Sequence, residues 1–227
     1  MLHAETVEKG TFDLLKTLMS DKQLAHFNLA GGTALALYLG HRISVDLDLF
    51  TPNAFEARDL STYLNDNYNF NEDFIRNNTL RGDIANVKID CITYNYPMLE
   101  KPVVDTNGVR LYGIKDIAAM KLSSIVDNGT RLKDFIDIAS LSVELSLSDM
   151  LGAYNKKFKG TNAISPIKGL SYYDDINFKE PIQMTGANFN WNKIEKRIKS
   201  MIKNDKLVFA DLPCGSFKND RQTGLKF

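Results

Sequence analysis

A glycine pair followed by alternating aspartates restricts what this 227-residue chain can fold into. Residues 28–50 read NLAGGTALALYLGHRISVDLDLF, in which Gly31 and Gly32 precede an apolar run, and Asp46 and Asp48 alternate with apolar residues. By itself, a glycine pair indicates a turn, and alternating aspartates indicate the solvated face of a strand. A turn, a short helix and a strand with an acidic face, in this order, favour a binding site.

Local patterns predict the elements around this stretch. We expect a short strand over residues 27–30, followed by a helix that Thr33 caps and that ends near Gly40. Strict alternation over residues 43–49 predicts a second strand, whose successive side chains point to opposite faces. The polar face would carry Ser44, Asp46 and Asp48. The apolar face would carry Ile43, Val45, Leu47 and Leu49.

The remaining chain shows further helix and strand signals. Apolar spacing predicts helices over residues 5–19, 53–65, 115–126, 131–142, 148–160 and 191–203. Strands are expected over residues 69–76 and 84–92, with Asp90 on the polar face of the second. These elements predict an α/β (α+β) fold with a small mixed sheet in residues 1–110, a helical lobe in residues 111–205 and a C-terminal extension in residues 206–227.

Composition narrows the classes of partner. Lys plus Arg and Asp plus Glu number 28 each, so no overall charge draws the chain to nucleic acid or to an anionic membrane. Cys91 and Cys214 lie far apart and match no metal or redox spacing, which indicates free thiols in a reducing compartment. The sequence shows neither a signal-peptide pattern nor a long apolar run, so we expect a cytoplasmic protein without a membrane partner.

Two carboxylates on one strand face suggest a bound cation. Asp46 and Asp48 would repel each other unless a cation compensates their charge. Magnesium takes oxygen ligands and commonly binds one or two carboxylates together with substrate phosphates. Asp90 on a neighbouring strand would complete a site for two ions. Gly31 and Gly32, without side chains, would let a triphosphate approach backbone N–H groups at the start of a helix.

These residues resemble a known family. The glycine pair, short helix and Asp-hydrophobic-Asp strand are similar to the signature of the DNA polymerase beta-like nucleotidyltransferase superfamily. More narrowly, GGTALAL, HRISVDLDLF, AAMKLSSI and RLKDFIDI resemble the AbiEii/AbiGii toxin family of bacterial nucleotidyltransferases, named for abortive phage infection. The likeness continues through GLSYYDDI and the helix from Trp191, and it implies the nucleotidyltransferase fold.

The resemblance also implies roles for the matching residues. The nucleotide, a nucleoside triphosphate, would be bound by Gly31, Gly32, Thr33, Arg42, Ser44 and Lys121. Two Mg²⁺ ions would be held by Asp46, Asp48 and Asp90. Asp90 would in addition orient or deprotonate the acceptor hydroxyl. Lys121 in AAMKL would reach the phosphates, and Asp134 in RLKDF matches the catalytic aspartate of the last motif, with Asp137 as its neighbour.

The implied activity is the metal-dependent transfer of a nucleoside monophosphate to a hydroxyl acceptor, either tRNA or a protein. Such an enzyme would act as a toxin that a neighbouring antitoxin protein counters. Two alternatives stay open: a transferase that modifies a small molecule such as an antibiotic, and a catalytically silent binding module with the same fold.

Several charged residues also have simpler interpretations. By composition alone, Lys121 and Asp134 could belong to solvated helix faces. His26 and His41 lack metal-ligand spacing, which favours packing or capping. The basic residues Lys156, Lys157 and Lys159 and the helix over residues 193–203 indicate solvated faces, or alternatively a surface for acceptor RNA.

Overall fold

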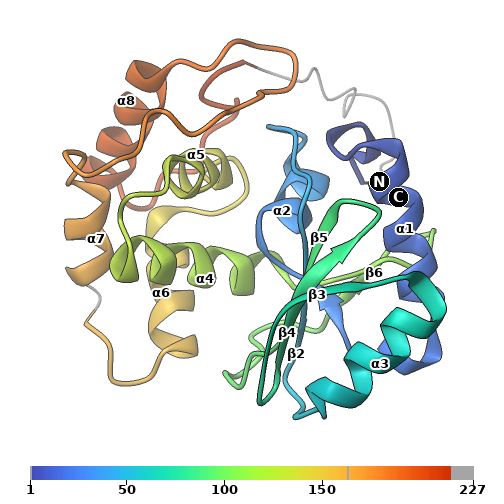
Figure 1. Cartoon of the computed structure of the whole chain (residues 1–227). Helices are drawn as coiled ribbons and strands as arrows, with labels where there is room; N and C mark the ends of the chain where they lie inside the picture. Colours follow the sequence, from blue (N-terminus) through green and yellow to red (C-terminus); the bar gives the residue numbers. More distant parts are fainter. Residues whose placement is uncertain (1, 163, 216–227) are drawn as a thin grey trace, which may run out of the picture.

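A mixed sheet organises the first half of the chain in the computed structural model, which describes residues 2–162 and 164–215 (Figure 1). The described residues form seven strands in the spatial order β3-β4-β5-β2-β1-β7-β6. Their bounds are β1 Asn28–Leu29, β2 Leu47–Thr51, β3 Asn71–Arg76, β4 Thr79–Ile84, β5 Val87–Thr93, β6 Val103–Val104 and β7 Arg110–Leu111. Strand β2 runs parallel to β5, and β1 runs parallel to β7, whereas the other neighbours are antiparallel.

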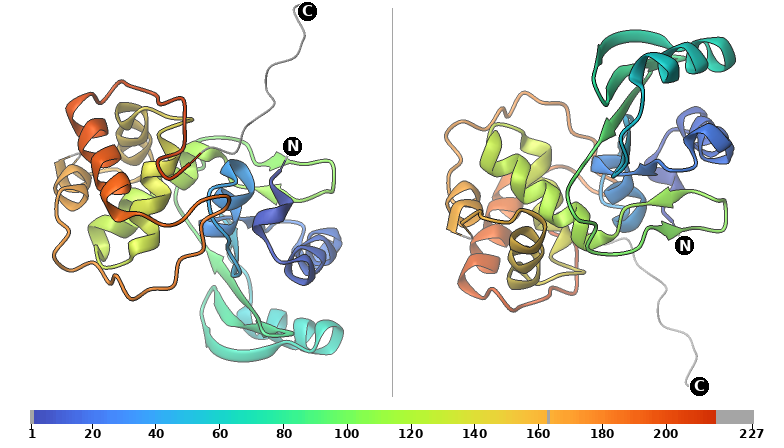
Figure 2. Two further views of the ribbon diagram at one scale, coloured as in Figure 1. Left: turned by 90° about the horizontal axis from the view of Figure 1, so that it is seen from above. Right: turned by 90° about the horizontal axis from the view of Figure 1, so that it is seen from below.

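Helices cover the sheet and form a second group beside it. Their bounds are α1 Lys9–Ser20, α2 Gly31–Leu39, α3 Ala57–Tyr68, α4 Ile114–Asp127, α5 Leu132–Leu141, α6 Leu147–Lys157, α7 Ile164–Leu170 and α8 Trp191–Lys203. Helices α4 to α8 gather on one side of the molecule, and α3 packs against the β3–β4 hairpin on the other (Figures 1 and 2). The predicted α/β class with a mixed sheet and a C-terminal helical lobe is confirmed.

Helix α2 lies between the sheet and the helical group. It contacts β2 on one side and α4 and α5 on the other. This position explains its composition, because a helix that is buried all round is apolar all round. Ala34, Leu35 and Leu37 are all fully buried. The helix ends at Gly40, which has a φ of 65°, a left-handed conformation that favours glycine.

Most expected helices are present, but several short elements were not predicted. Helix α8 has the expected bounds, and α1 begins after a short 3-10 turn at Ala4–Thr6. Strand β4 was missed because Gly82 weakens its strand signal. A Cβ at Gly82 would lie 2.0 Å from the backbone oxygen of Asn71, so only glycine allows β3 to approach this closely. Strands β6 and β7 and helix α7 were also missed because they are short.

The strand predicted over residues 43–49 was wrong in its first half. Strand β2 begins only at Leu47, and Val45 is 51% exposed instead of packing on an apolar face. The backbone N–H groups of Ile43 and Ser44 instead donate to Gln183 and Thr6, which lie outside the sheet. Tertiary partners therefore override the alternating pattern in this segment.

The prediction that Lys157 lies on a solvated face was also wrong. Lys157 is 1% exposed, and its Nζ lies 2.6 Å from Oδ1 of Asp116 and donates to the backbone oxygen of Pro97. Asp116 also accepts hydrogen bonds from the backbone N–H groups of Leu99 and Glu100. This buried ion pair joins α4, α6 and the segment after β5.

The boundaries of the predicted sheet domain, helical lobe and C-terminal extension stay predictions. Strand β7 ends at Leu111 and helix α4 begins at Ile114, close to the predicted boundary at residue 110. Of the predicted extension 206–227, residues 216–227 lie outside the described residues. Within the described part of the chain, each helix is too short or too polar to cross a membrane.

Candidate active site

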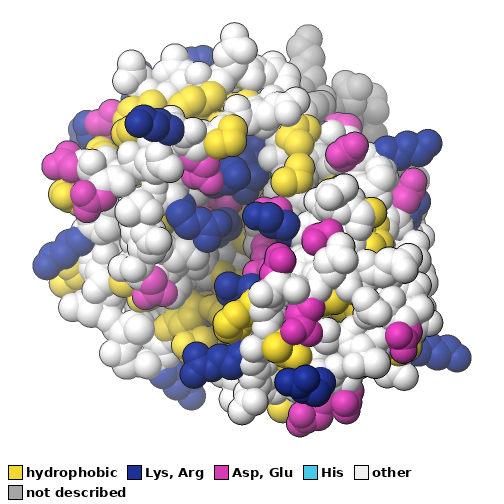
Figure 3. Space-filling view, in the orientation of Figure 1, with side chains coloured by type: hydrophobic (Ala, Val, Ile, Leu, Met, Phe, Trp, Pro, Cys, Tyr) yellow, Lys and Arg dark blue, Asp and Glu magenta, His cyan; other side chains and the backbone are white. Residues whose placement is uncertain are grey.

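The glycine pair begins α2 at the base of a cleft between the sheet and the helical group. Two adjoining cavities of about 420 Å³ and about 270 Å³ share Gly32, Asp48, Lys121 and Arg131 as lining residues. Positive and negative side chains gather around this hollow (Figure 3). The cleft is therefore both polar and large enough for a small ligand.

The glycines leave room for two charged side chains. Gly31 has a φ of 66°, and a Cβ there would lie 1.8 Å from Oδ2 of Asp48. A Cβ at Gly32 would lie 2.4 Å from Nη2 of Arg42. The glycine pair thus allows the Asp48 carboxylate and the Arg42 guanidinium to pack against the start of α2.

Thr33 does not cap α2, contrary to the sequence prediction. The helix already begins at Gly31, with Ala30 at the N-cap position. Thr33 is buried, and its hydroxyl hydrogen-bonds to the backbone oxygen of Asp46 and, at 2.9 Å, to the Ser44 hydroxyl. Thr33 therefore fixes the segment that carries Asp46 and leads into β2.

Two of the predicted metal ligands lie side by side. Asp48 on β2 and Asp90 on β5 are directly paired in the parallel register, so their side chains share one sheet face. Burial raises the pKa of Asp48 to about 6; Lys121 opposes this shift, and the charges of Asp90 and Asp46 add to it. The pKa of Asp90 is also raised, mainly by burial, although Arg81 opposes the shift.

The acidic group has the chemistry of a divalent-cation site. Its donors are carboxylate oxygens, which magnesium prefers. A cation would stabilise the charged forms of Asp48 and Asp90, which burial, and to a smaller extent neighbouring aspartates, disfavour. Among residues 2–162 and 164–215, no group of three or more His, Cys, Asp or Glu side chains is placed so that it could hold a metal ion. Asp90 instead lies 3.2 Å from Nε of Arg81.

A second acidic group lies behind the first and already has cationic partners. Asp137 on α5 accepts two hydrogen bonds from Arg42, at 2.7 and 2.9 Å, and lies 2.8 Å from Nε2 of His41. Lys121 on α4 lies 2.7 Å from Asp137 and 2.8 Å from Asp134. All five side chains are buried. This group fixes two of the cations that line the cleft, Arg42 and Lys121.

The two predicted aspartates of the last motif have different partners. Asp134 lies 2.8 Å from Lys121 and 3.5 Å from Arg131. Asp137, the less certain neighbour in the sequence prediction, contacts Lys121, Arg42 and the His41 imidazole. The i, i+3 spacing of Asp134 and Asp137 in RLKDFIDI, which places both on one helix face, was the signal for this arrangement.

Sequence analysis missed the apolar part of the cleft. In the smaller cavity, Phe50 and Tyr94 stack with ring centroids 5.3 Å apart and an interplanar angle of 22°. Met120, Ser123 and Asp127 from α4 line the same cavity. Since these residues come from three elements that are distant in sequence, no local motif could have indicated them.

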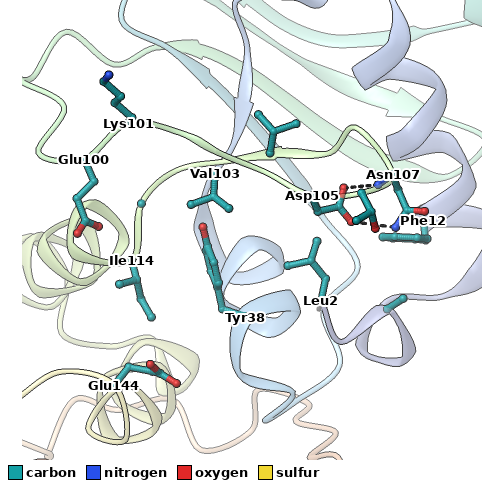
Figure 4. Close-up of a pocket in the computed structure, with 14 residues that line it drawn as sticks. Leu2, Phe12, Tyr38, Glu100, Lys101, Val103, Asp105, Asn107, Ile114 and Glu144 are labelled. Carbon is teal, nitrogen blue, oxygen red and sulfur yellow. Dashed lines mark hydrogen bonds between the residues drawn. The ribbon is translucent and has the colours of Figure 1, made fainter. Parts of the chain in front are cut away.

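A further cavity of about 700 Å³ lies away from this cleft, beside strand β6 (Figure 4). Leu2, Tyr38, Val103 and Ile114 form much of its wall. Its acidic residues are Glu100, Asp105 and Glu144, of which Asp105 is hydrogen-bonded to Asn107. Among the described residues, its lining includes one cationic side chain, Lys101, whereas four line the larger cavity of the cleft.

A comparison with solved structures agrees with the fold. Over 88% of this chain and 96% of the other, the structure resembles the "Crystal structure of putative nucleotidyltransferase from H. pylori", with a TM-score of 0.56 and 15% sequence identity. This likeness identifies the nucleotidyltransferase fold.

The sequence comparisons identify the family. The family described as nucleotidyl transferase AbiEii toxin, type IV toxin–antitoxin system, matches residues 13–104. The uncharacterized protein aq_aa25 of Aquifex aeolicus (strain VF5) is 30% identical over 182 residues, which cover 78% of this chain and 86% of that protein. The chain belongs to the AbiEii nucleotidyltransferase family, as the sequence motifs predicted.

Proposed function

We propose that this chain is a metal-dependent toxin that transfers a nucleoside monophosphate from a nucleoside triphosphate to a hydroxyl group of an RNA or protein. The observation that carries the proposal is the in-register pair of Asp48 and Asp90 beside the start of α2. The paired cations Arg42 and Lys121 face the same cleft. Partly compensated acids and cations held in place are thus adjacent, as the transfer of a nucleotide from a charged triphosphate to a hydroxyl requires.

The larger cavity suits the triphosphate. Its lining includes Arg42, Lys121, Arg131 and Lys133, together with the Ser44 and Thr33 hydroxyls. The start of α2 at Gly31 and Gly32 adds backbone N–H groups, which favour anions. The smaller cavity, with Phe50 and Tyr94, offers aromatic faces on which a nucleobase can pack.

The acidic group suits the reacting end of the nucleotide. Asp46, Asp48 and Asp90 would hold divalent cations, which when bound neutralise charge on the phosphates and on the attacking oxygen. In the transfer, the acceptor oxygen bonds to the α-phosphorus while the bond to the β-phosphate breaks, and pyrophosphate leaves with the negative charge. Asp90 would accept or direct the proton of the acceptor hydroxyl. Arg42 and Lys121 would stabilise the departing pyrophosphate.

Partners follow from this proposal. A nucleoside triphosphate is the donor substrate, and an antitoxin protein would restrain the toxin in the cell. We expect the chain to work in the cytoplasm, where nucleoside triphosphates and Mg²⁺ are both supplied.

Radiolabelled transfer tests the proposal. The protein is incubated with Mg²⁺ and each of the common nucleoside triphosphates labelled at the α-phosphate, together with total RNA or total protein. We expect one fraction to take label, and we expect no labelling with Asp48→Asn or with a chelator. The absence of labelling in both fractions, together with the absence of triphosphate binding in calorimetry, would instead favour a silent module.

A further inference from the structure

We propose that a row of side chains across three strands, Phe74 on β3, Arg81 on β4 and Asp90 on β5, is the docking platform for a single-stranded RNA end that accepts the nucleotide. This inference rests on the proposed function and identifies where the acceptor binds. Phe74 pairs with Arg81, and Arg81 pairs with Asp90, in the strand register. Asp90 in turn pairs with Asp48, so the row ends at the reacting centre.

The platform is exposed on one face of the sheet. Helix α3 packs against β3 and β4 on the opposite face, where Leu80, Gly82 and Ile84 are buried (Figure 2). Phe74 is 46% exposed, and Arg81 is exposed beside it. A large exposed aromatic side chain next to a catalytic group is a candidate contact for a ligand.

The location agrees with the direction from which the acceptor must approach. Both cavities assigned to the nucleotide lie on the side of Asp48 that faces α4, and neither is lined by β4. Attacking and leaving oxygens lie roughly in line in phosphoryl transfer. The acceptor therefore approaches from the other side of the acidic group, over β5 and β4.

The chemistry of the platform matches a nucleic acid. The Arg81 guanidinium lies 6.0 Å from the ring centroid of Phe74, so a cation and an aromatic face are presented together. Arg76 and Lys88 are exposed and lie on the same face by strand alternation. Single-stranded nucleic acids are bound by this combination, in which bases stack on aromatic rings and cations contact phosphates.

Arg81 links acceptor binding to the reacting centre. Without an acceptor, Arg81 lies 3.2 Å from Asp90 and compensates its charge. If a phosphate of the acceptor binds the Arg81 guanidinium, the Asp90 carboxylate loses this partner and becomes free to turn toward Asp48. Arg81 is thus a positioning residue, which keeps Asp90 paired until the acceptor arrives.

Fluorescence anisotropy with a labelled single-stranded RNA of about ten nucleotides tests the platform on the full chain. Phe74→Ala should weaken RNA binding by about 5- to 100-fold, because stacking of one base is worth about 1–3 kcal/mol, and Phe74→Trp should retain binding. Arg81→Ala should weaken binding and reduce the slope of log affinity against log salt by about 0.7, as expected for one lost phosphate contact. Arg81→Lys should retain part of the affinity.

Matched controls remove an arginine and an aromatic ring elsewhere. Arg58→Ala alters an exposed arginine on α3, on the covered side of the hairpin, and Tyr172→Ala removes an exposed ring from the helical group. Both controls should bind RNA as the unchanged protein does. Equal binding by Phe74→Ala, equal losses in the controls, or a failure of the unchanged protein to bind RNA would each overturn the platform. Labelling of a protein alone in the transfer assay would indicate a protein acceptor and also overturn it.

Calorimetry with Mg²⁺ and a nucleoside triphosphate separates this inference from the proposed function. Phe74→Ala and Arg81→Ala should keep the triphosphate affinity of the unchanged protein. If the unchanged protein binds the triphosphate but the RNA results fail, the platform is wrong and the transferase stands. If RNA binding depends on Phe74 but no triphosphate binds, this surface binds RNA, but the transferase proposal fails and with it the role of the RNA as acceptor.

Discussion

Two groups of aspartates in this molecule have opposite electrostatic surroundings. In the helix group, burial alone would raise the pKa of Asp137, but Arg42 and Lys121 hold it well below its usual value. In the sheet group, burial raises the pKa of Asp48 to about 6, and neighbouring aspartates add to this shift. The same residue type is therefore stabilised as an anion at one place and destabilised at the other.

This difference separates an acid whose charge the chain itself compensates from an acid whose charge it compensates only in part. The charge of Asp137 is fully compensated by the chain's own cations, so it stabilises the arrangement of Arg42 and Lys121. The charge of Asp48 is compensated only in part, and a ligand that brings a cation can complete this compensation. The predictions below test whether the two groups differ in this way.

The largest expected effect is on catalysis in the sheet group. Asp48→Asn should reduce nucleotidyl transfer by about a thousandfold or more, because a metal ligand contributes several kcal/mol to the transition state. Initial rates of label incorporation measure the loss, and circular dichroism should show an unchanged fold. A fully active Asp46→Ala, Asp48→Ala double variant would refute the assignment of this group.

The largest expected effect on stability is in the helix group. Asp137→Ala leaves the buried cations Arg42 and Lys121 without their main partner, which should cost about 3–5 kcal/mol. Urea unfolding measures the change in the free energy of unfolding. Asp46→Ala, which removes an exposed carboxylate, is the matched control and should change stability by less than about 0.5 kcal/mol. Similar losses in both variants would remove the contrast between the groups.

A smaller effect is expected on the pH dependence of stability. Because the folded-state pKa of Asp48 is raised to about 6, its ionisation destabilises the fold above that pH, and the penalty disappears as pH falls toward 4. Without divalent cations, Asp48→Asn should therefore be more stable than the unchanged protein at pH 7.5, by about 1–2 kcal/mol after allowance for solvent screening.

The same comparison at pH 4 and with added Mg²⁺ provides the control. The advantage of Asp48→Asn should become small at pH 4, where folded Asp48 is protonated and its pKa lies only just below the pH in the unfolded chain, and should shrink when Mg²⁺ binds the unchanged protein. Thermal unfolding measures both effects. An advantage that is independent of pH would show that the charge of Asp48 is not its source.

The smallest effect concerns the glycine that accommodates Asp48. Gly31→Ala should destabilise the fold by about 1–2 kcal/mol, because the backbone is left-handed and the new Cβ would clash with Asp48. In the background of Asp48→Ala the two shortest contacts disappear and a tight contact of 3.1 Å with the remaining Cβ is left, so the loss should shrink by about 1 kcal/mol. Gly10→Ala in α1, which has open space around it, should instead be neutral or slightly stabilising. Equal losses at Gly31 in both backgrounds would argue against the contact.

Much of the fold was predictable because local patterns agree with the tertiary structure there. Helix α8 buries Ile194, Ile198 and Met201 along one face, and this spacing predicted its bounds. Strand β4 was missed because Gly82 interrupts its pattern, although both of its partners, β3 and β5, are its neighbours in sequence. The segment before Leu47 was mispredicted because its backbone pairs with Gln183 and Thr6.

The candidate site likewise contains residues that could be predicted from the sequence and residues that could not. Gly31, Gly32 and the alternation of Asp46 with Asp48 are neighbours in sequence, so their chemistry could be inferred from spacing alone. The role of Asp137 could not be inferred, because Arg42, His41 and Lys121 reach it from other elements.

The sequence by itself determined the family, the glycine pair and the aspartate alternation, because each is encoded by residues that are close together in the chain. Only the tertiary structure decided which acids are compensated and which remain available for a ligand. The physical reason is that the energy of a charge depends on burial and on cations a few ångströms away, and those neighbours are brought together by folding.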